Sequence, residues 1–371
     1  MSESERPALR VVIAGGGTGG HVFPGVAVAR EIGARRPDAQ ISFAGTARGI
    51  EARVVPQEGF VLDLIRSSGL KGKSLAARAR GAALVVPGLL DAWRIVSRRR
   101  PHVVVGVGGY SSGPVVLVAA LRGVATIVLE QNAVPGLTNR LLARVVRAAA
   151  VTFESTTAFF GGKAFVSGNP VRPEFLRPVE PQQEPGHDGG TPSAQVLVFG
   201  GSQGAHAINM AMVEAATELA VHASHLRVTH QTGERDVELV RAGYRKAGLA
   251  ADVAPFFDDM ARRIRQADLI VCRAGATTVA EVTASGKPAI FVPLPTATDD
   301  HQRKNAEALA AAGAADLLLE PAMTGRTLAE RIVGLAADPD RRRRMAAAAR
   351  ALAKPDAARV IVDRVLELAA S

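Results

Sequence analysis

The chain has 371 residues, of which 47% are hydrophobic and 22% charged, with a formal net charge of +10. This length predicts two domains of roughly 150 to 200 residues each, and the high apolar content excludes a disordered chain. A single cysteine, Cys272, excludes an internal disulfide and makes a reducing cytoplasm the expected location. Neither a secretory signal nor a membrane-spanning helix is expected, because the first residues are polar and the apolar stretches are too short.

The first half of the chain alternates short β-branched segments with glycine turns and alanine-rich helices. A strand is predicted at 11–14, followed by the turn GGGTGG at 15–20 and by a helix that reaches Arg36. Further strands are predicted at 41–44, 103–107 and 126–129. This alternation is typical of βαβ units and a parallel sheet.

The pattern stops at 173–193, a proline-rich and glycine-rich stretch that we expect to be a linker or surface loop. The first unit then recurs, with a strand at 196–199, the turn GGSQGA at 200–205 and a helix from His206. Later strands are predicted at 269–272 and 289–292, and Pro355 is expected to break the helical C-terminal segment.

The sequence therefore predicts an α/β protein with two Rossmann-like domains. The expected parts are an N-terminal domain (1–172), the linker (173–193), a C-terminal domain (194–354) and a C-terminal helix (355–371). One arrangement for that helix is packing against the N-terminal domain.

The turn 15–20 matches the pattern G-x-G-x-x-G, which directs backbone N–H groups and a helix N-terminus toward an anion. A dinucleotide site also needs an acid at the end of the second strand. Here that strand ends at Gly45 and Thr46, and the first acid is Glu51, which disfavours NAD. A turn needed only for close packing of helix and strand is the alternative.

Two glycine-containing turns in the second half have similar chemistry. In the turn 200–205, the hydroxyl of Ser202 can donate to a phosphate. In the segment 272–281 (CRAGATTVAE), small and hydroxyl residues at a helix start suit a pyrophosphate, and Glu281 can reach ribose hydroxyls. An ordinary helix cap with a solvated glutamate is the alternative. Three such turns in two similar domains predict a cleft that holds a sugar nucleotide.

Eight ordered motifs between Gly15 and Ala306 carry a family resemblance: GGGTGGHVFPGVAVA, GVGGYSSGP, EQNAVPGLTNR, GNPVR, GGSQGAHAIN, FFDDM, CRAGATTVAE and DDHQRKNA. The chain resembles the N-acetylglucosaminyltransferases that convert lipid I to lipid II in peptidoglycan synthesis. The resemblance implies a GT-B fold, in which two Rossmann-like domains face each other across a cleft. The second domain would bind most of the UDP-GlcNAc donor, and the first would bind the acceptor.

The implied reaction is inverting transfer of GlcNAc from UDP-GlcNAc to the 4-hydroxyl of MurNAc in undecaprenyl-pyrophosphoryl-MurNAc-pentapeptide, which is lipid I. The implied location is the cytoplasmic face of the plasma membrane, where a peripheral enzyme would support cell wall biogenesis, cell shape, cell division and the cell cycle. The resemblance leaves room for contacts with other proteins of cell-wall synthesis, and it implies no nucleic-acid partner.

The resemblance also assigns individual residues. Those expected near the donor sugar and acceptor are Thr18, Gly19, Gly20 and Asn132. Those expected at the nucleotide and its phosphates are Arg172, the backbone of Phe257, Ser202, Ala276, Thr277 and Thr278. Glu281 would hold the ribose and Gln302 the GlcNAc hydroxyls. Other positions that the family's motifs mark as functionally sensitive are Tyr110, Glu130, Asn139, Asn209 and Arg273.

Two positions depart from the family's motifs. The family often has a histidine before the glutamate of its EQN motif, where this chain has Leu129, so that histidine is not an obligatory base here. The family also often has paired glutamines where this chain has His301 and Gln302, so the first sugar contact does not transfer directly.

Inverting transfer needs a base for the proton of the acceptor hydroxyl and a means of stabilising the departing UDP. His21 directly follows the first glycine turn, and imidazole titrates near neutral pH, so His21 is the first candidate base. A hydrogen-bonding role at the helix start is an equally weighted alternative, and Glu130 is the second candidate base. No metal cofactor is expected, because the only D-x-D string, at 338–340, lies beside an arginine run far from the glycine turns.

The segment 66–100 contains nine basic residues and one acid, Asp91, among interleaved apolar residues. Such a segment can lie on an anionic leaflet. A buried helix with solvated arginines is the alternative, which a lipid-linked acceptor disfavours. The residues expected at the membrane face are Arg78, Arg80, Leu89, Leu90 and Trp93.

Two rival functions fit part of the sequence. A UDP-GlcNAc 2-epimerase would share the donor cleft and would turn over UDP-GlcNAc without an acceptor. A nucleic-acid-binding protein would account for the positive charge, but one Trp, two Tyr and no recognisable RNA or DNA motif disfavour it.

Overall fold

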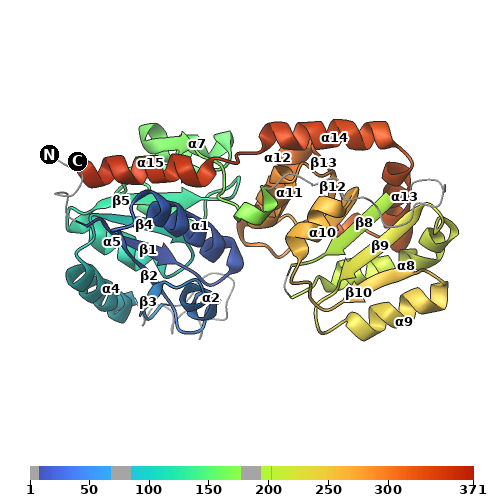
Figure 1. Ribbon diagram of the computed structural model, residues 1–371, viewed down its shortest axis with the longest axis horizontal. Coiled ribbons are helices and arrows are strands. Elements are labelled where there is room, and N and C mark those ends of the chain that lie inside the picture. The colour runs from blue at the N-terminus through green and yellow to red at the C-terminus, as the bar shows by residue number, and fades with distance from the viewer. Residues whose placement is uncertain (1–7, 68–84, 177–193, 202) are drawn as a thin grey trace. The chain divides into compact units, whose positions relative to one another are not determined.

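The computed structural model describes residues 8–67, 85–176, 194–201 and 203–371. The chain divides into two compact units, which are shown in Figure 1. Unit 1 comprises Met1–Arg172 and Lys354–Ser371, and unit 2 comprises Pro173–Ala353. Each unit is a parallel β-sheet with helices on its faces, so the expected pair of parallel-sheet α/β domains is confirmed.

The described part of unit 1 contains a seven-stranded sheet in the order β3-β2-β1-β4-β5-β6-β7. Its strands are β1 (Arg10–Gly15), β2 (Gln40–Gly45), β3 (Val61–Leu64), β4 (Val103–Gly108), β5 (Ala125–Glu130), β6 (Ala148–Val151) and β7 (Ala164–Val166). The central strands β1 and β4 are parallel, with Val11 opposite Val103. Both are β-branched and buried on both faces, as strands of a covered parallel sheet usually are.

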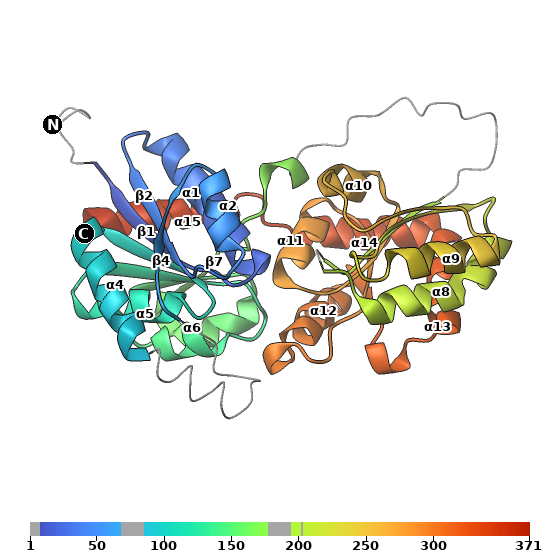
Figure 2. The same ribbon diagram turned by 90° about the horizontal axis from the view of Figure 1, so that it is seen from below.

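Helices cover both faces of this sheet (Figures 1 and 2). They are α1 (Gly19–Arg35), α2 (Glu51–Gln57), α4 (Val85–Arg99), α5 (Ser112–Leu121), α6 (Leu137–Leu142), α7 (Thr157–Phe160) and α15 (Ala357–Ala370). Because side chains alternate along a strand, Val11 and Ile13 pack with α1 and α15, while Val12 and Ala14 pack with α4 and α5.

The chain returns to unit 1 at its C-terminal end. Helix α14 (Pro339–Leu352) ends before Pro355, and α15 follows and packs against α1. Ile361 and Val365 of α15 are fully buried, and Arg35 of α1 forms an ion pair with Asp363 at 2.7 Å. These contacts make α15 part of the core of unit 1.

The described part of unit 2 contains a six-stranded sheet in the order β10-β9-β8-β11-β12-β13. Its strands are β8 (Ala194–Phe199), β9 (Leu226–Gln231), β10 (Ala251–Ala254), β11 (Leu269–Cys272), β12 (Ala289–Phe291) and β13 (Ala315–Leu317). Its helices are α8 (His206–Val221), α9 (Val237–Ala247), α10 (Met260–Gln266), α11 (Ala276–Ala284), α12 (His301–Ala311), α13 (Gly325–Ala336) and α14.

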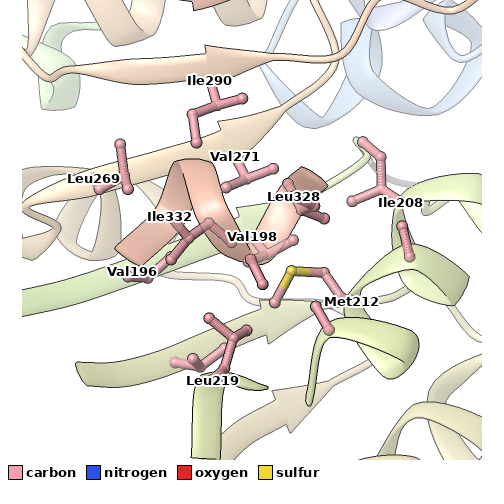
Figure 3. Close-up of a cluster of buried hydrophobic side chains, with 14 of the residues drawn as sticks. Val196, Val198, Ile208, Met212, Leu219, Leu269, Val271, Ile290, Leu328 and Ile332 are labelled. Carbon is pink, nitrogen blue, oxygen red and sulfur yellow. The ribbon is translucent and has the colours of Figure 1, made fainter. Parts of the chain in front are cut away.

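One face of this sheet forms a core with α8 and α13. Val196 and Val198 of β8 pack there against Met212 of α8 and Leu328 and Ile332 of α13 (Figure 3). At the start of unit 2, the part of the predicted linker that is described forms a 3-10 helix, Pro173–Phe175, in which Phe175 is buried. Residues 177–193 of the predicted linker lie outside the described residues.

Both sheets have the strand order of a doubly wound nucleotide-binding fold, in which the order reverses beside the first strand of the unit. In such folds, ligands bind outside the carboxyl ends of the strands at this reversal. The reversal lies between β1 and β4 in unit 1 and between β8 and β11 in unit 2. Among the described residues, no helix has both the length and the apolar character required to span a bilayer.

Candidate active site

The loops after β1 and β4 meet at the carboxyl edge of unit 1. A Cβ atom on Gly109, whose φ is +80°, would lie 2.3 Å from the carbonyl oxygen of Gly16. A Cβ on Gly15 would lie 2.5 Å from the carbonyl oxygen of Gly108. The glycines therefore allow two backbones to approach more closely than any side chain permits.

His21 lies in the first turn of α1, above this approach. Its Nδ1 atom is 3.2 Å from the carbonyl oxygen of Gly16 and 3.3 Å from the hydroxyl of Thr18. A carbonyl oxygen can only accept, so we assign the hydrogen to Nδ1, which leaves the basic lone pair of the neutral ring on Nε2. The ring packs against Gly108, where a Cβ would lie 2.6 Å from Cδ2 of His21. This tautomer suits a general base that acts through Nε2.

Glu51, at the start of α2, is a buried carboxylate that is 1% exposed. Its Oε2 accepts the N–H of Gly17 at 2.7 Å, and its Oε1 accepts the N–H and hydroxyl of Thr46 at 2.9 and 2.8 Å. Burial raises the pKa of this carboxyl, but the N–H groups of Gly17 and Thr46 outweigh that effect and hold the pKa below its ordinary value. Glu51, which lies too far beyond the end of β2 to bind the ribose of a dinucleotide, thus binds the glycine turn itself.

Glu130, at the end of β5, is also buried and is 2% exposed. Its Oε1 accepts the backbone and side-chain N–H groups of Asn132 at 3.0 and 3.3 Å. Its Oε2 accepts the N–H of Gly136 at 3.0 Å and the side-chain N–H of Asn139 at 2.9 Å. Burial raises the pKa of Glu130, and the Asn139 side chain opposes this shift. Because its oxygens already accept four N–H groups, Glu130 fits a role in shaping the loop better than a role as base.

The remaining candidates of unit 1 are Thr18, Gly19, Gly20, Tyr110 and Arg172. Thr18 precedes α1, and Gly19 and Gly20 form its first turn. Tyr110 is half exposed in the loop after β4, and its carbonyl accepts the hydroxyl of Ser67 at 2.9 Å. The guanidinium of Arg172 lies 5.0 Å from the ring centroid of Phe23 in α1.

The departure at Leu129 has a packing explanation. Its side chain lies in the core between the sheet and helices α1 and α15, and its carbonyl accepts the side-chain N–H of Asn139 at 2.9 Å. A residue at this position therefore faces the apolar core, while its neighbour Glu130 faces the loop.

In unit 2, the glycine turn after β8 contacts the end of β9. A Cβ on Gly204, whose φ is +74°, would lie 1.9 Å from the carbonyl oxygen of Thr232. The side chain of Gln231 donates to the carbonyl of Gly201 at 3.1 Å and accepts the N–H of Phe257 at 2.8 Å. Gln231, which the sequence analysis did not identify, therefore joins the glycine turn to the loop that carries Phe257. Ser202, the expected phosphate donor, lies outside the described residues.

Asn209, in α8, belongs to a buried network beneath this turn. Its side-chain N–H groups donate to the carbonyl of Thr232 at 2.9 Å and to Asp236 at 2.8 Å, and its oxygen lies 3.1 Å from Nε2 of His230. The Nδ1 of His230 lies 2.7 Å from the hydroxyl of Tyr244. Burial lowers the pKa of His230 to about 3, so the ring stays neutral near neutral pH. Asn209 therefore has a structural role, because its hydrogen bonds hold Thr232, which contacts the glycine turn, in place.

The third expected turn lies between β11 and α11. Ala276, Thr277 and Thr278 form the first turn of α11, and Glu281 follows on the same helix and is buried. Asn305 of α12 donates to the carbonyl of Ala274 at 3.1 Å, which joins α12 to this turn.

Two other candidates, Arg273 and Gln302, and the neighbouring His301 bind backbone groups close to them. Arg273 donates to the carbonyls of Val292 and Pro293 at 3.1 and 3.2 Å and pairs with Glu320 at 2.6 Å. Gln302 accepts the N–H of Leu294 at 3.1 Å, and Nδ1 of His301 lies 2.6 Å from the carbonyl oxygen of Thr298. The arginine thus supports the strand end after β12, and His301 is bound to its own turn.

The D-x-D string has a structural role. Asp338 caps α14, where its carboxylate accepts the N–H of Arg341 at 2.8 Å. Across the described part of the chain, no group of three or more His, Cys, Asp or Glu residues could hold a metal ion.

The expected membrane face is described in part. On α4, Leu90 is 52% and Trp93 is 54% exposed, while Leu89 packs against the core of unit 1. The guanidinium of Arg122 lies 4.5 Å from the ring centroid of Trp93. Arg78 and Arg80 lie outside the described residues.

Two regions of the chain match the two domains of one glycosyltransferase family. Residues 11–151 match the glycosyltransferase family 28 N-terminal domain, and residues 195–361 match the family 28 C-terminal domain. The protein is therefore a glycosyltransferase of this class, which agrees with two sheets that carry glycine turns at their reversal points.

The particular family follows from a full-length relative. The chain is 50% identical over 365 residues to the UDP-N-acetylglucosamine--N-acetylmuramyl-(pentapeptide) pyrophosphoryl-undecaprenol N-acetylglucosamine transferase of Anaeromyxobacter sp. (strain K), covering 97% of this chain and 93% of the relative. This chain belongs to that transferase family, which confirms the resemblance seen in the sequence.

Two solved structures share the fold. The crystal structure of Acinetobacter baumannii MurG has a TM-score of 0.78 and 33% identity, covering 97% of this chain and all of that chain. A UDP-N-acetylglucosamine 2-epimerase has a TM-score of 0.70 but only 14% identity, covering 97% of this chain and 96% of that one, which shows the fold alone. The epimerase alternative is accordingly less supported than the transferase.

Proposed function

We propose that this enzyme transfers GlcNAc from UDP-GlcNAc to the 4-hydroxyl of MurNAc in undecaprenyl-pyrophosphoryl-MurNAc-pentapeptide, and so forms lipid II. The observation that carries the proposal is the 50% identity to a full-length relative whose name describes this transfer. The glycine turns at the reversal points of both sheets support it, because such turns direct backbone N–H groups toward anionic groups.

The proposed reaction joins the acceptor oxygen to the anomeric carbon of GlcNAc as the bond to UDP breaks. Nε2 of His21 takes the proton of the acceptor hydroxyl, and the hydrogen bond from Nδ1 to Gly16 keeps the lone pair on Nε2. The negative charge on departing UDP meets the helix starts of α8 and α11, with the hydroxyls of Thr277 and Thr278. In this proposal no metal cofactor takes part.

The test is transfer of radiolabelled GlcNAc from UDP-GlcNAc to a short-chain lipid I analogue, with and without a chelator. We expect labelled disaccharide product that requires the acceptor and persists in the chelator. Turnover of UDP-GlcNAc without acceptor, into its 2-epimer, would instead establish the epimerase. Activity that chelation abolishes would contradict the metal-free mechanism.

We further propose that unit 1 docks on the anionic inner leaflet of the plasma membrane, where the lipid-linked acceptor lies. Val86, Leu90 and Trp93 are exposed and follow one another at helical spacing on α4. Exposed apolar residues beside a strongly basic sequence segment are typical of a surface that lies in a bilayer interface.

The double substitution Leu90→Glu with Trp93→Glu is expected to weaken binding to vesicles rich in anionic phospholipid by roughly tenfold or more, because it removes two apolar side chains from the interface and adds like charge. Vesicle co-sedimentation measures this. Val221→Glu, at a 78% exposed apolar position of unit 2, is the matched control and should leave binding unchanged. Charge reversal at Arg78 and Arg80 should also weaken binding. Equal binding by the double variant and the control would exclude this face.

A further inference from the structure

We propose that Glu51 is a positioning residue for His21, acting through the peptide group between Gly16 and Gly17. The inference rests on the proposed function, in which His21 is the base. Glu51 does not contact the acceptor or donor in this proposal, and its effect on turnover passes through the imidazole.

The first observation is the way in which the chain closes around the Glu51 carboxyl. A Cβ on Gly16 would lie 2.3 Å from Cδ of Glu51, and a Cβ on Gly49 would lie 2.0 Å from its Oε2. A Cβ on Gly45 would lie 2.6 Å from its Cγ. The turn after β1 and the connection from β2 to α2 therefore approach this side chain at three glycines, so the loop is shaped around a carboxylate at this place.

The second observation is that Glu51 and His21 bind opposite edges of one peptide group. Oε2 of Glu51 accepts the N–H of Gly17 at 2.7 Å, and Nδ1 of His21 lies 3.2 Å from the carbonyl oxygen of Gly16. That N–H and that carbonyl belong to the same planar peptide unit. The carboxylate fixes the orientation of the plane, and hydrogen bonds in series polarise one another, so the Gly16 carbonyl becomes a better acceptor for Nδ1–H.

The consequence for chemistry concerns the tautomer and aim of the imidazole. A rigid, polarised Gly16 carbonyl keeps the hydrogen on Nδ1 and holds the ring in one orientation, with Nε2 directed as a base. Thr46 contributes indirectly, since its N–H and hydroxyl hold the other oxygen of Glu51. One chain of hydrogen bonds therefore connects the Glu51 carboxylate to the His21 imidazole through the Gly16–Gly17 peptide group.

Glu51→Gln tests this chain of hydrogen bonds, because an amide has one accepting oxygen and one donating NH2 group. The N–H groups of Gly17 and Thr46 approach different oxygens of the carboxylate, so an amide leaves one of them facing another donor. We expect a fall in kcat of about tenfold or more, with the Kd for UDP-GlcNAc within twofold of wild type.

A double-mutant cycle with His21→Ala separates positioning from general stability. If Glu51 acts through the imidazole, Glu51→Gln costs no further turnover once His21 is gone. Asp63→Asn is the matched control: Asp63 is another buried carboxylate of unit 1, paired with Arg98 and Arg99. This variant should lower the unfolding temperature and leave kcat unchanged.

The inference is overturned if Glu51→Gln keeps kcat within twofold of wild type, or if it lowers kcat by the same factor with and without His21. Should Glu51→Gln not fold, Thr46→Val decides, since it removes one bond to Oε1 and keeps the carboxylate. We expect it to lower kcat about threefold, and only when His21 is present. Wild-type turnover by His21→Ala would refute the base assignment itself, and an absence of GlcNAc transfer by the wild-type enzyme would refute the proposed function.

Discussion

Replacement of His21 by alanine is expected to lower kcat by about 10²-fold to 10⁴-fold, the range that a positioned general base contributes. The Kd for UDP-GlcNAc should stay within about twofold of wild type, because the donor is proposed to bind unit 2. Single-turnover transfer to a lipid I analogue gives the first quantity, and equilibrium titration with UDP-GlcNAc gives the second.

Two further variants distinguish a base from a hydrogen-bond donor. His21→Asn keeps an N–H near the position of Nδ1, which can still donate to Gly16, but it has no basic nitrogen. It should be as slow as His21→Ala. His102→Ala removes a histidine that accepts the N–H of Arg10 at 3.2 Å at the opposite end of β4, and it should leave kcat unchanged. Recovery of turnover in His21→Asn would assign His21 a structural role.

The fold could be predicted from the sequence wherever strand chemistry was strong. Val11–Ala14 and Val196–Phe199 are apolar and largely β-branched, and each precedes a glycine turn, so β1 and β8 were predicted nearly to their observed ends. Strand β6 (Ala148–Val151) was not predicted, because three of its four residues are alanine, which has no strand preference. It becomes a strand because it pairs with β5 and packs in the core, which are tertiary effects.

The candidate site could be predicted only where its residues follow a strand along the chain. His21 and the glycine turns were predicted in this way. Glu51 was noticed only as an acid in the wrong place for a ribose, since nothing in the sequence states that it turns back to Gly17, 34 residues earlier. Gln231 and His230 lie in a strand that the sequence analysis did not identify, and their roles arise from contacts with Gly201 and Asn209.

Glu51, Gln231 and His230, whose roles the sequence did not reveal, share one physical property. They are buried polar side chains whose partners are backbone groups or side chains of distant segments, and burial without those partners would be costly. Such partners are assigned by the fold and not by local pattern. The Glu51 carboxylate binds the first glycine turn. Gln231 joins the second glycine turn to the loop that carries Phe257, and the Asn209 network supports the end of β9 beside that turn.

The second glycine turn offers a test of its own, because Gly204→Ala should damage both stability and donor binding. The new Cβ would lie 1.9 Å from the carbonyl oxygen of Thr232, and the φ of +74° is itself unfavourable for alanine. Left-handed backbone costs about 1–2 kcal/mol and overpacking about 1–3 kcal/mol more, so we expect a loss of about 2–5 kcal/mol in the free energy of unfolding. Calorimetry of the 371-residue chain, with and without UDP, measures this loss.

Gly248→Ala is the matched control for backbone strain alone. Gly248 has a φ of +71° at the end of α9, and a Cβ there would meet no atom within 4 Å. It should cost only the left-handed term of about 1–2 kcal/mol and leave the Kd for UDP unchanged. Gly204→Ala should in addition weaken UDP binding by at least tenfold, since the turn must move away from Thr232 and its N–H groups move with it. If Gly204→Ala is destabilised no more than the control but no longer binds UDP, the turn binds the phosphates and the close backbone contact is not what limits stability. If Gly204→Ala is destabilised but binds UDP with unchanged affinity, this turn is not part of the donor site.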